Sequence, residues 1–252
     1  MTRLRLNKIL AQAGLTSRRG ADQLLLEGRV AVNGVVVREL GTLADPDVDD
    51  VRFDGRRVGA AEPREYFLLH KPAGFVTSRH DPEGRAVVTD LVSATARLFP
   101  VGRLDVDVEG ALLLTNDGAL THRLLHPRYR VPRVYEAEVA GHVSRAALGR
   151  WREGAQLDDG PAVPLGVELV HAGARTSRLR LTFAEGRKHE VKRYCEALGH
   201  RVVRLRRISF GPITLGTLPL GAARPLTEHE LTALRAAVQA AGSPDRRSLP
   251  AE

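Results

Sequence analysis

Apolar residues recur at helical spacing near the start of the chain and at strand spacing soon afterwards. The spacing over residues 6–13 predicts a helix that ends at Gly14. Ser17 can cap a second helix, which ends near Gly28. Alternating apolar positions and Asn-Gly or Asp-Gly turns predict short strands at residues 30–37 and 51–55. The pattern therefore predicts a small domain of helices and a small sheet over residues 3–60.

Strand patterns dominate from Tyr66 onward. Short apolar or alternating stretches predict strands at residues 66–70, 73–77, 101–104, 111–115, 134–140, 165–170, 178–183 and 202–205. Helical spacing and end signals predict helices at residues 120–125 and 190–198 and after the capping box at Thr227. Beyond a linker at 59–63, this indicates an α+β domain over residues 64–240, with a mixed, mainly antiparallel central sheet flanked by helices. We expect the tail at 241–252 to be disordered.

The composition excludes several classes of protein. The chain has 252 residues, of which 43% are hydrophobic and 27% charged, as in a globular protein with a sizeable core. No apolar run approaches the roughly 18 residues of a membrane span, and the N-terminus lacks the apolar region of a secretory signal. We therefore expect a cytoplasmic protein without a membrane partner. A single cysteine, Cys195, excludes an internal disulfide, and the histidines show no metal-ligand spacing.

The charge favours a polyanionic partner, most simply nucleic acid or an anionic membrane surface, although many soluble proteins are also basic. The net charge is +8, and it is unevenly distributed. Residues 1–30 carry six basic and two acidic side chains, whereas residues 39–54 carry six acidic and one basic. The first domain is therefore expected to have one basic face and one acidic side. Residues 186–207 have a net charge of +6, the strongest local charge in the chain.

Three carboxylates follow one another closely where the predicted strand 101–104 gives way to a loop. Alternation places Arg103 and Asp105 on one face of that strand, and Gly110 permits the turn back. A carboxylate on a loop between strands suits a nucleophile or an acid–base group. The same pattern is typical of an acidic surface loop, and spacing alone favours that simpler interpretation.

Tyr135 shares the core face of the predicted strand 134–140 with Ala137 and Val139. A tyrosine in such a position usually packs in the core, with its hydroxyl bonded to a nearby group. It can instead stack on a nucleic-acid base from the floor of a pocket. Spacing alone favours packing.

The predicted helix 190–198 has one apolar and one polar stripe. The apolar stripe comprises Val191, Tyr194, Cys195 and Leu198, so Cys195 is expected in the core. The polar stripe comprises His189, Lys192, Arg193 and Glu196. It fits either a solvated basic surface or an RNA-facing surface with one cation reaching inward. His189 by itself indicates neither a metal nor a general base.

These residues carry a resemblance to a known family. The catalytic motif of the RsuA/RluB family of ribosomal-RNA pseudouridine synthases resembles GRLDVDVEGALLLTNDG at 102–118. That family's C-terminal motifs are similar to EGRKHEVKR at 185–193 and VVRLRRISFGPITL at 202–215. The S4 RNA-binding domain, which such enzymes carry at the N-terminus, resembles the sequence at 6–34. The resemblance extends from about residue 3 to 232, and the first motif is its most specific part.

The resemblance implies roles for individual residues. Asp105 matches the catalytic aspartate, and Tyr135 matches the tyrosine that packs against the target base. Lys192 matches the basic residue that pairs with the aspartate. Arg103 matches the arginine that works on the RNA as the uridine is extruded. Two neighbouring positions depart from the family's usual residues, and both bear on hydrogen bonding within the loop: Val108 and Ala111.

We therefore predict site-specific isomerisation of uridine to pseudouridine in ribosomal RNA, with small-subunit rRNA favoured over large-subunit rRNA. Uridine is detached at N1 and rejoined at C5 without redox or group transfer, so the resemblance implies no cofactor and no metal. The expected partner is rRNA or a pre-ribosomal particle, and the expected state is a monomer. Besides Arg103, the residues predicted to bind RNA, mainly through phosphates, are Lys8, Arg18, Arg19, Arg29, Arg187, Lys188 and Arg193.

Two other functions are compatible with parts of the sequence. The first is a non-catalytic RNA-binding or ribosome-assembly factor that keeps the fold, against which the presence of Asp105, Tyr135 and Lys192 argues. The second is a glycosidase-like hydrolase that combines Asp105 with Asp107 or Glu109. Such an enzyme needs two carboxylates facing each other across a pocket, and neighbouring side chains of one loop seldom converge in this way.

Overall fold

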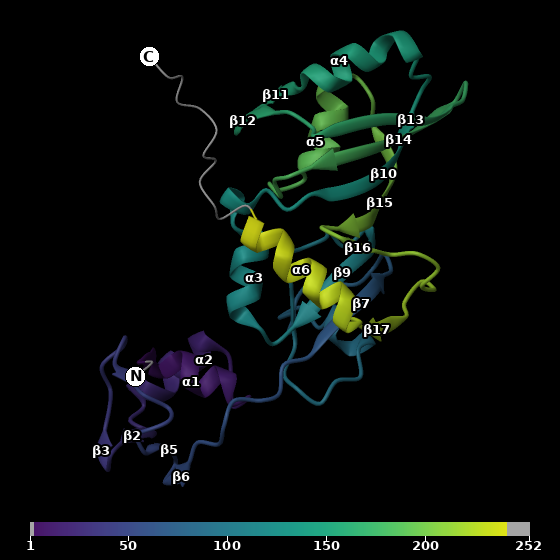
Figure 1. Ribbon diagram of the computed structural model, residues 1–252. Coiled ribbons are helices and arrows are strands. Elements are labelled where there is room, and N and C mark those ends of the chain that lie inside the picture. Colours follow the sequence, from purple (N-terminus) through teal and green to yellow (C-terminus); the bar gives the residue numbers. More distant parts are fainter. Residues whose placement is uncertain (1–2, 241–252) are drawn as a thin grey trace, which may run out of the picture. The chain divides into compact units, whose positions relative to one another are not determined.

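The computed structural model describes residues 3–240, in two compact units (Figure 1). The first unit comprises residues up to Arg64 together with Thr95–Arg97, and the second comprises the remainder. The tail for which disorder was predicted, 241–252, lies outside the described residues. Within the described residues, no helix is both long and apolar enough to cross a membrane.

The first unit contains two short helices and small sheets. Its helices are α1 (Leu6–Gln12) and α2 (Arg18–Leu26). Its strands are β1 (Leu4–Arg5), β2 (Val30–Val32), β3 (Val35–Val36), β4 (Leu43–Ala44), β5 (Val51–Phe53) and β6 (Arg56–Arg57). Strands β3, β2, β5 and β6 form one sheet in that order, and β1 pairs with β4.

Local signals in the sequence account for this unit. The Ser17 hydroxyl accepts a hydrogen bond from the Gly20 amide and so caps α2, as predicted. The β2–β3 turn contains Asn33 and Gly34 with φ angles of 51° and 84°, which are the left-handed values that a two-residue hairpin turn requires. The core buries apolar side chains from both helices and from three strands: Leu6, Ile9, Leu10, Ala21, Leu25, Val30, Ala44 and Val51.

The second unit is built on a nine-stranded mixed sheet. The strands of the unit are β7 (Tyr66–Lys71), β8 (Phe99–Pro100), β9 (Glu109–Thr115), β10 (Arg133–Ala140), β11 (Ala155–Leu157), β12 (Gly160–Ala162), β13 (Gly166–Ala172), β14 (Thr176–Phe183), β15 (Val202–Phe210), β16 (Ile213–Thr214) and β17 (Ala223–Pro225). The helices are α3 (Gly118–Leu125), α4 (Leu148–Glu153), α5 (Glu190–Ala197) and α6 (Glu228–Ala240). Short 3₁₀ turns occupy Val88–Leu91, Pro127–Tyr129 and Arg145–Ala147.

The central sheet has the order β13-β14-β10-β15-β9-β7-β17, with β16 paired to β15 and β8 to β9. Among these described pairs, the only parallel one is β9 with β15, so the predicted mixed, mainly antiparallel sheet is confirmed. This parallel pair joins two antiparallel parts, which Figure 1 shows one above the other. A small hairpin, β11–β12, lies apart from the sheet.

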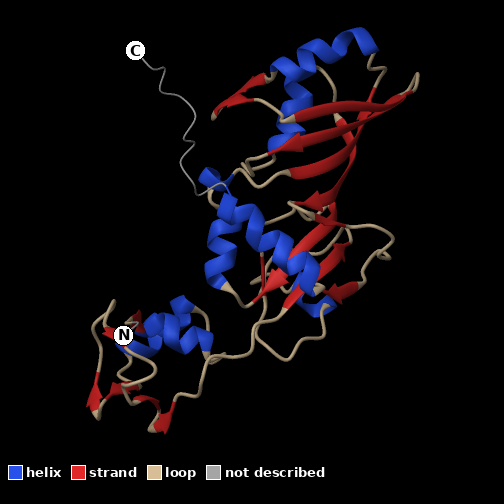
Figure 2. Cartoon of the chain, viewed as in Figure 1, coloured by secondary structure: helices blue, strands red, loops and turns tan. Residues whose placement is uncertain are grey.

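The helices pack on the two parts of the sheet, as Figure 2 shows. Helices α3 and α6 bury leucines against β7 and β9, in a core that also contains Phe210 of β15. Helices α4 and α5 lie near β10, β13 and β14, and there the Tyr194 ring contacts Phe183 and Trp151 at centroid distances of 5.2 and 5.8 Å. The capping box before α6 forms as predicted, with reciprocal bonds between Thr227 and Glu230.

Two predicted strands are wrong. Residues 73–77 and 101–104 form loops instead of strands. Their apolar side chains are still buried in part, which produced the strand-like pattern. The backbone of Leu104, however, is bonded to a side chain and not to a neighbouring strand, because the Thr77 hydroxyl donates to the Leu104 carbonyl and accepts from its amide. Gly102, with a φ of 74°, also breaks the extended conformation.

Gly110 allows β9 and β15 to pair. It has a φ of 120° and lies directly opposite Arg207 in the parallel ladder. A Cβ atom at this position would be 2.1 Å from the Arg207 carbonyl oxygen. Any side chain would therefore push the two strands apart, and the two parts of the sheet with them.

We expect Gly110→Ala to destabilise the second unit strongly, by about 2–4 kcal/mol, because it combines backbone strain with a clash against backbone atoms. Urea denaturation of the full chain measures this effect. Gly199→Ala is the matched control, since Gly199 also has positive φ, 86°, but has open space where its Cβ would be. If the two variants lose the same stability, close strand approach is not the constraint at Gly110.

Candidate active site

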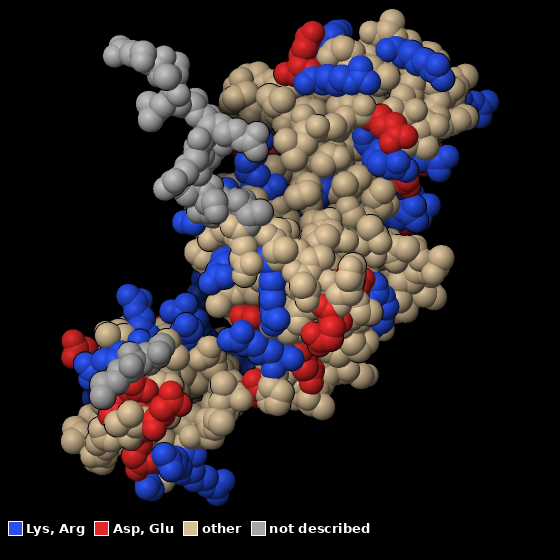
Figure 3. Space-filling model, in the orientation of Figure 1, with Lys and Arg blue, Asp and Glu red and all other residues tan. Residues whose placement is uncertain are grey.

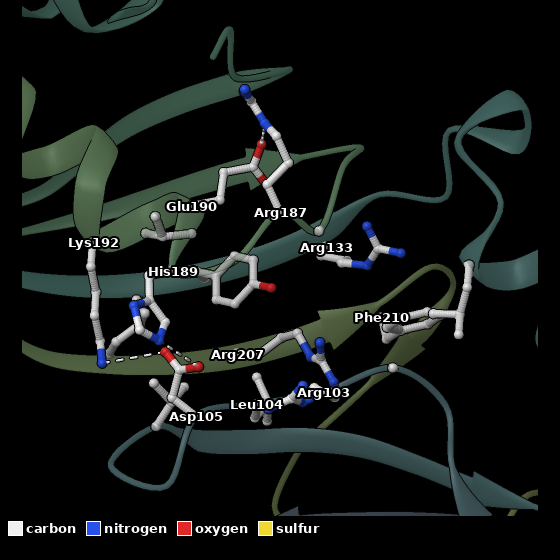
Figure 4. A pocket seen from close by; sticks show the side chains of 17 residues that line it. Arg103, Leu104, Asp105, Arg133, Arg187, His189, Glu190, Lys192, Arg207 and Phe210 are labelled. Atoms are coloured by element: carbon white, nitrogen blue, oxygen red, sulfur yellow. Dashed lines mark hydrogen bonds and ion pairs between the residues drawn. The ribbon is translucent and has the colours of Figure 1, made fainter. Parts of the chain in front are cut away.

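A pocket of about 100 Å³ lies in the second unit, where the loop before β9, strand β10, strand β15 and the start of α5 meet. We call residues 101–108 the aspartate loop. The pocket is lined by Gly102, Arg103, Leu104, Asp105, Val108, Leu125, Arg133, Tyr135, Gly186, Arg187, His189, Glu190, Val191, Lys192, Leu205, Arg207 and Phe210 (Figure 4). The structure thus brings together segments that are more than 80 residues apart in the chain, 103–105 and 187–192.

Asp105 has two basic neighbours in this pocket. Its carboxylate lies 3.4 Å from the Lys192 ammonium and 3.5 Å from Nε2 of His189 (Figure 4). Its side chain is 32% exposed, so the carboxylate is accessible to a ligand. Asp105 and Lys192 therefore lie close together, as the resemblance implies for the catalytic aspartate and its basic partner.

Lys192 is shared between two carboxylates. Its ammonium donates to both oxygens of Asp107 at 2.8 Å, which is closer than its approach to Asp105. Partial burial lowers the pKa of Lys192, but the hydrogen bonds to Asp107 and the charges of both aspartates outweigh burial, so that its pKa is raised above the ordinary value. The hydrogen bonds from Lys192 lower the pKa of Asp107. Asp107 thus holds the lysine charged and in place beside Asp105.

Tyr135 lies on the core face of β10 and lines the pocket. The strand alternates between buried and half-buried positions, as the sequence predicts, and Tyr135 is 9% exposed. Arg103 is exposed and lines the same pocket from the aspartate loop. Both residues therefore line the same pocket as Asp105.

A buried lysine holds the aspartate loop in shape. Lys71, at the end of β7, is fully buried, and its ammonium donates to the carbonyls of Pro72, Asp105, Val106 and Val108 at 2.9–3.3 Å. Burial lowers its pKa to about 8, so the side chain is still mostly charged at neutral pH. This role of Lys71 was not predicted, because the lysine lies between the predicted strands 66–70 and 73–77 and belongs to neither.

Two of the predicted RNA-binding arginines in this unit bind other parts of the protein. Arg187 donates to Asp159 and Glu190 and to the carbonyls of the β11–β12 turn. Arg193 makes a bidentate pair with Asp159 at 2.8–2.9 Å. Lys188, between them, is exposed. Arg187 and Arg193 thus fix α5 and the preceding loop against the β11–β12 hairpin, and Lys188 is the most accessible of the three.

The predicted RNA-binding residues of the first unit differ from one another in exposure and in the groups that they contact. Arg18 and Arg19 are exposed at the start of α2, and Lys8 is half-buried on α1. Arg29 makes a bidentate pair with Asp54, contacts Glu27, and lies over the ring of Phe53. Arg29 therefore joins the helical part of this unit to its sheet. Figure 3 shows basic and acidic side chains gathered on different parts of the drawn face of this unit.

Among the residues that line the pocket, three basic ones were not predicted as part of a site: His189, Arg133 and Arg207. His189 reaches Asp105 from a backbone with a φ of 51°, which is uncommon for a residue other than glycine. Arg133 and Arg207 are 5% and 1% exposed and line the pocket interior. Arginines on the apolar face of a strand were the available signal, because the alternation of β10 and β15 places both beside core residues. No cluster of metal-binding side chains occurs among residues 3–240.

Comparison with known proteins identifies the family. The model of the RNA pseudouridylate synthase family matches residues 65–197, and that of the S4 domain matches residues 4–49. The chain belongs to the RNA pseudouridylate synthase family. The enzyme is therefore an isomerase that converts uridine to pseudouridine in RNA, and its N-terminal unit contains an S4 RNA-binding domain, as the sequence analysis predicted.

Individual relatives align with the synthase over nearly its whole length. An uncharacterised RNA pseudouridine synthase of Aquifex aeolicus is 48% identical over 94% of this chain and 96% of its own. The ribosomal large subunit pseudouridine synthase B of Bacillus subtilis is 42% identical, covering 92% and 96% of the two chains. A crystal structure of a pseudouridylate synthase matches with a TM-score of 0.66 and 31% identity, over 92% of this chain and 99% of that one. The predicted preference for small-subunit rRNA finds no support among these relatives.

We expect Lys71→Met to destabilise the synthase by about 1–3 kcal/mol, because it leaves buried carbonyls without a donor. The single-turnover rate should also fall, since the aspartate loop loses the group that holds its backbone. Urea denaturation and a rate measurement with saturating enzyme test both effects. Lys188→Met, at an exposed lysine, is the control for stability. A Lys71→Met protein with unchanged stability and rate would rule out this role.

Proposed function

We propose that the synthase modifies uridine in large-subunit ribosomal RNA, and that Asp105 is its catalytic carboxylate. The observation that carries the proposal is the position of Asp105: an accessible carboxylate inside a pocket of about 100 Å³, 3.4 Å from the ammonium of Lys192. Its pocket is also lined by Tyr135, from a different strand. The preference for the large subunit is supported by the name of the Bacillus subtilis relative.

The reaction needs a carboxylate more than it needs any other group. The bond from C1′ to N1 breaks, a bond from C1′ to C5 forms, the proton of C5 leaves, and N1 gains a proton. A carboxylate can attack C1′, assist loss of a proton from the sugar, or add to C6 of the base. All three roles require an ionised carboxylate, and the Lys192 ammonium lies 3.4 Å from the carboxylate of Asp105.

The target uridine must leave the RNA stack before it reaches Asp105. Extruding a base costs a few kcal/mol, which contacts inside the pocket have to offset. Tyr135 offers an aromatic ring inside the pocket. Arg103 is exposed and lies on the aspartate loop, which lines the same pocket. We propose that Tyr135 stacks on the extruded base and that Arg103 contacts the RNA that the base has left.

The arrangement disfavours a hydrolase with two carboxylates. Asp107 is 71% exposed and bonded to Lys192, and Glu109 is bonded to Arg204 at 2.7 Å. Neither residue lines the pocket opposite Asp105. The other carboxylate in the pocket wall, Glu190, is buried, which raises its pKa, and it is bonded to Arg187. Among the pocket-lining residues, no second carboxylate is placed to act on the same bond.

We propose that residues 3–60 bind rRNA and that residues 64–240 carry the reaction. The exposed arginines at the start of α2 are suited to phosphate contacts, because helix N-termini and arginines both favour anions. Mapping pseudouridines in both rRNAs of a deletion strain tests the choice of substrate. Loss of a modification from large-subunit rRNA supports the proposal, whereas loss from small-subunit rRNA alone contradicts it.

We expect Asp105→Asn to abolish pseudouridine formation and to leave RNA affinity within a few-fold. Asparagine has nearly the same shape as aspartate, but it is uncharged and is a poor nucleophile. Tritium release from 5-³H-uridine in rRNA, under single-turnover conditions with saturating enzyme, measures the loss. Tyr135→Phe should give an intermediate rate, because its ring still stacks.

The control for this experiment is Asp107→Asn. It removes a carboxylate two residues away, which holds Lys192 but has no assigned part in the reaction, so most of the activity should remain. A folded Asp107→Asn protein without activity, or substantial turnover by Asp105→Asn, would show that the wrong carboxylate had been chosen.

We expect the double variant Arg18→Ala/Arg19→Ala to weaken rRNA binding and flatten its salt dependence. The slope should fall by roughly 0.7–0.9 log units for each phosphate that the protein no longer neutralises. Arg29→Ala should change the slope much less, because its guanidinium is already bonded to Asp54. Titrations at several salt concentrations compare the two. Equal changes in slope would contradict the proposal that Arg18 and Arg19 bind phosphates while Arg29 does not.

A further inference from the structure

Two arginines are buried in the pocket, and neither forms an ion pair within the part of the chain that the structure describes. Arg207 is 1% exposed and Arg133 is 5% exposed, and both line the cavity. The guanidinium carbon of each lies 5.2 Å from the centre of the same ring, that of Phe210. Burial lowers the pKa of Arg133, and the positive charge of Arg207 lowers it further. Neither makes an ion pair with any residue between 3 and 240. The nearby buried carboxylate, Glu190, is bonded to Arg187.

Their hydrogen bonds to the protein leave donors unused. Nε of Arg207 donates to the Ala111 carbonyl at 2.7 Å, and Nη1 of Arg133 donates to the Ala184 carbonyl at 3.2 Å. The Nη2 atom of Arg207 is buried and has no hydrogen-bond partner among the described residues. A buried donor without a partner costs about 1–3 kcal/mol, and more when it is charged. On a side chain that lines a pocket, such a donor is available to an acceptor that a ligand supplies.

The position of the arginines relative to Asp105 limits what that ligand can be. Figure 4 shows Lys192 and His189 on one side of Asp105, and Arg207, Arg133 and Phe210 on the other. If Asp105 acts on the sugar or on C6 of the base, the uracil ring extends from there into the pocket. Its carbonyl oxygens are then the acceptors that meet Arg207 and Arg133.

The chemistry places negative charge on those oxygens. When C1′–N1 breaks, the bonding electrons stay with the base and are shared among N1, O2 and O4. When a carboxylate adds to C6 instead, the electrons move through C5 onto O4. Either route makes the ring transiently anionic, and the charge is gone once C5 has bonded to C1′ and the proton lost from C5 has been balanced by a proton gained at N1. Donors fixed in advance at the place where charge develops are an effective means of catalysis.

We propose that Arg207 and Arg133 form a subsite that stabilises the transient uracil anion through its ring oxygens. The inference rests on the proposed assignment of this pocket as the active site. Arg207 is then a catalytic residue, and it acts whichever of the three routes Asp105 follows.

The first experiment tests the preference for an anionic ring without relying on changes at the arginines. It uses full-length Asp105→Asn protein, in which no carboxylate repels an anion at this position. The ligands are free 5-nitrouracil, whose ring is anionic at neutral pH, and free thymine, which is neutral and also carries a group at C5. Titration calorimetry should give an affinity at least about 10-fold higher for 5-nitrouracil. Equal affinities would overturn the proposal.

The second experiment measures the reaction. Arg207→Gln in the otherwise unchanged enzyme should lower the single-turnover rate by about 10²–10³-fold and leave rRNA affinity within a few-fold. Arg207→Lys should recover part of the rate, because it restores the charge. Arg206→Gln is the matched control, since Arg206 is adjacent on β15, pairs with Glu136 and lies outside this pocket. It should keep nearly the full rate.

The outcomes separate this inference from the proposed function. If Asp105→Asn retains turnover, the assignment of the active site is wrong. If Asp105→Asn is inactive while folded Arg207→Gln is fully active, or loses only rRNA affinity, the anion subsite alone is wrong. Should Arg207→Gln fail to fold, the comparison of 5-nitrouracil with thymine decides the question.

Discussion

The site depends on the close parallel approach of β9 and β15, which the absence of a side chain at Gly110 permits. This single pairing joins two antiparallel parts of the sheet. The aspartate loop leads directly into β9, and Arg207 lies on β15 opposite Gly110. The same pairing therefore holds the sheet together and brings Asp105 to the pocket that Arg207 and Tyr135 line. The geometry of the whole site therefore depends on having no side chain at Gly110.

The aspartate loop itself has little regular structure, and its shape comes from buried polar groups. Lys71 bonds three of its carbonyls, and Thr77 bonds both backbone groups of Leu104. A buried ammonium is stable only when acceptors surround it, so the loop and the lysine stabilise each other. The loop is thereby fixed without the ladder of a strand. This leaves Asp105 accessible on a backbone whose position is well defined.

Basic residues divide into three groups according to what surrounds them. Arg29, Arg187 and Arg193 are bonded to carboxylates and hold parts of the protein together. Arg18, Arg19 and Lys188 are exposed and fit the general attraction of a basic protein for RNA. Arg133 and Arg207 are buried in the pocket without carboxylate partners among the described residues. Net charge alone distinguishes none of these groups, because it counts a paired and an unpaired arginine equally.

The sequence by itself determined the local features: the capped helices, the Asn-Gly hairpin, the two-faced strand with Tyr135 and the family motifs around Asp105 and Lys192. Each depends on neighbours within a few residues, so spacing and motif were enough. Only the tertiary structure decided that residues 101–104 are a loop, that Lys71 supports it, and that Arg133 and Arg207 face the same cavity. Those outcomes depend on which distant segments pair, and in particular on β9 lying beside β15. A pattern along one segment carries no information about the partner that satisfies its polar groups.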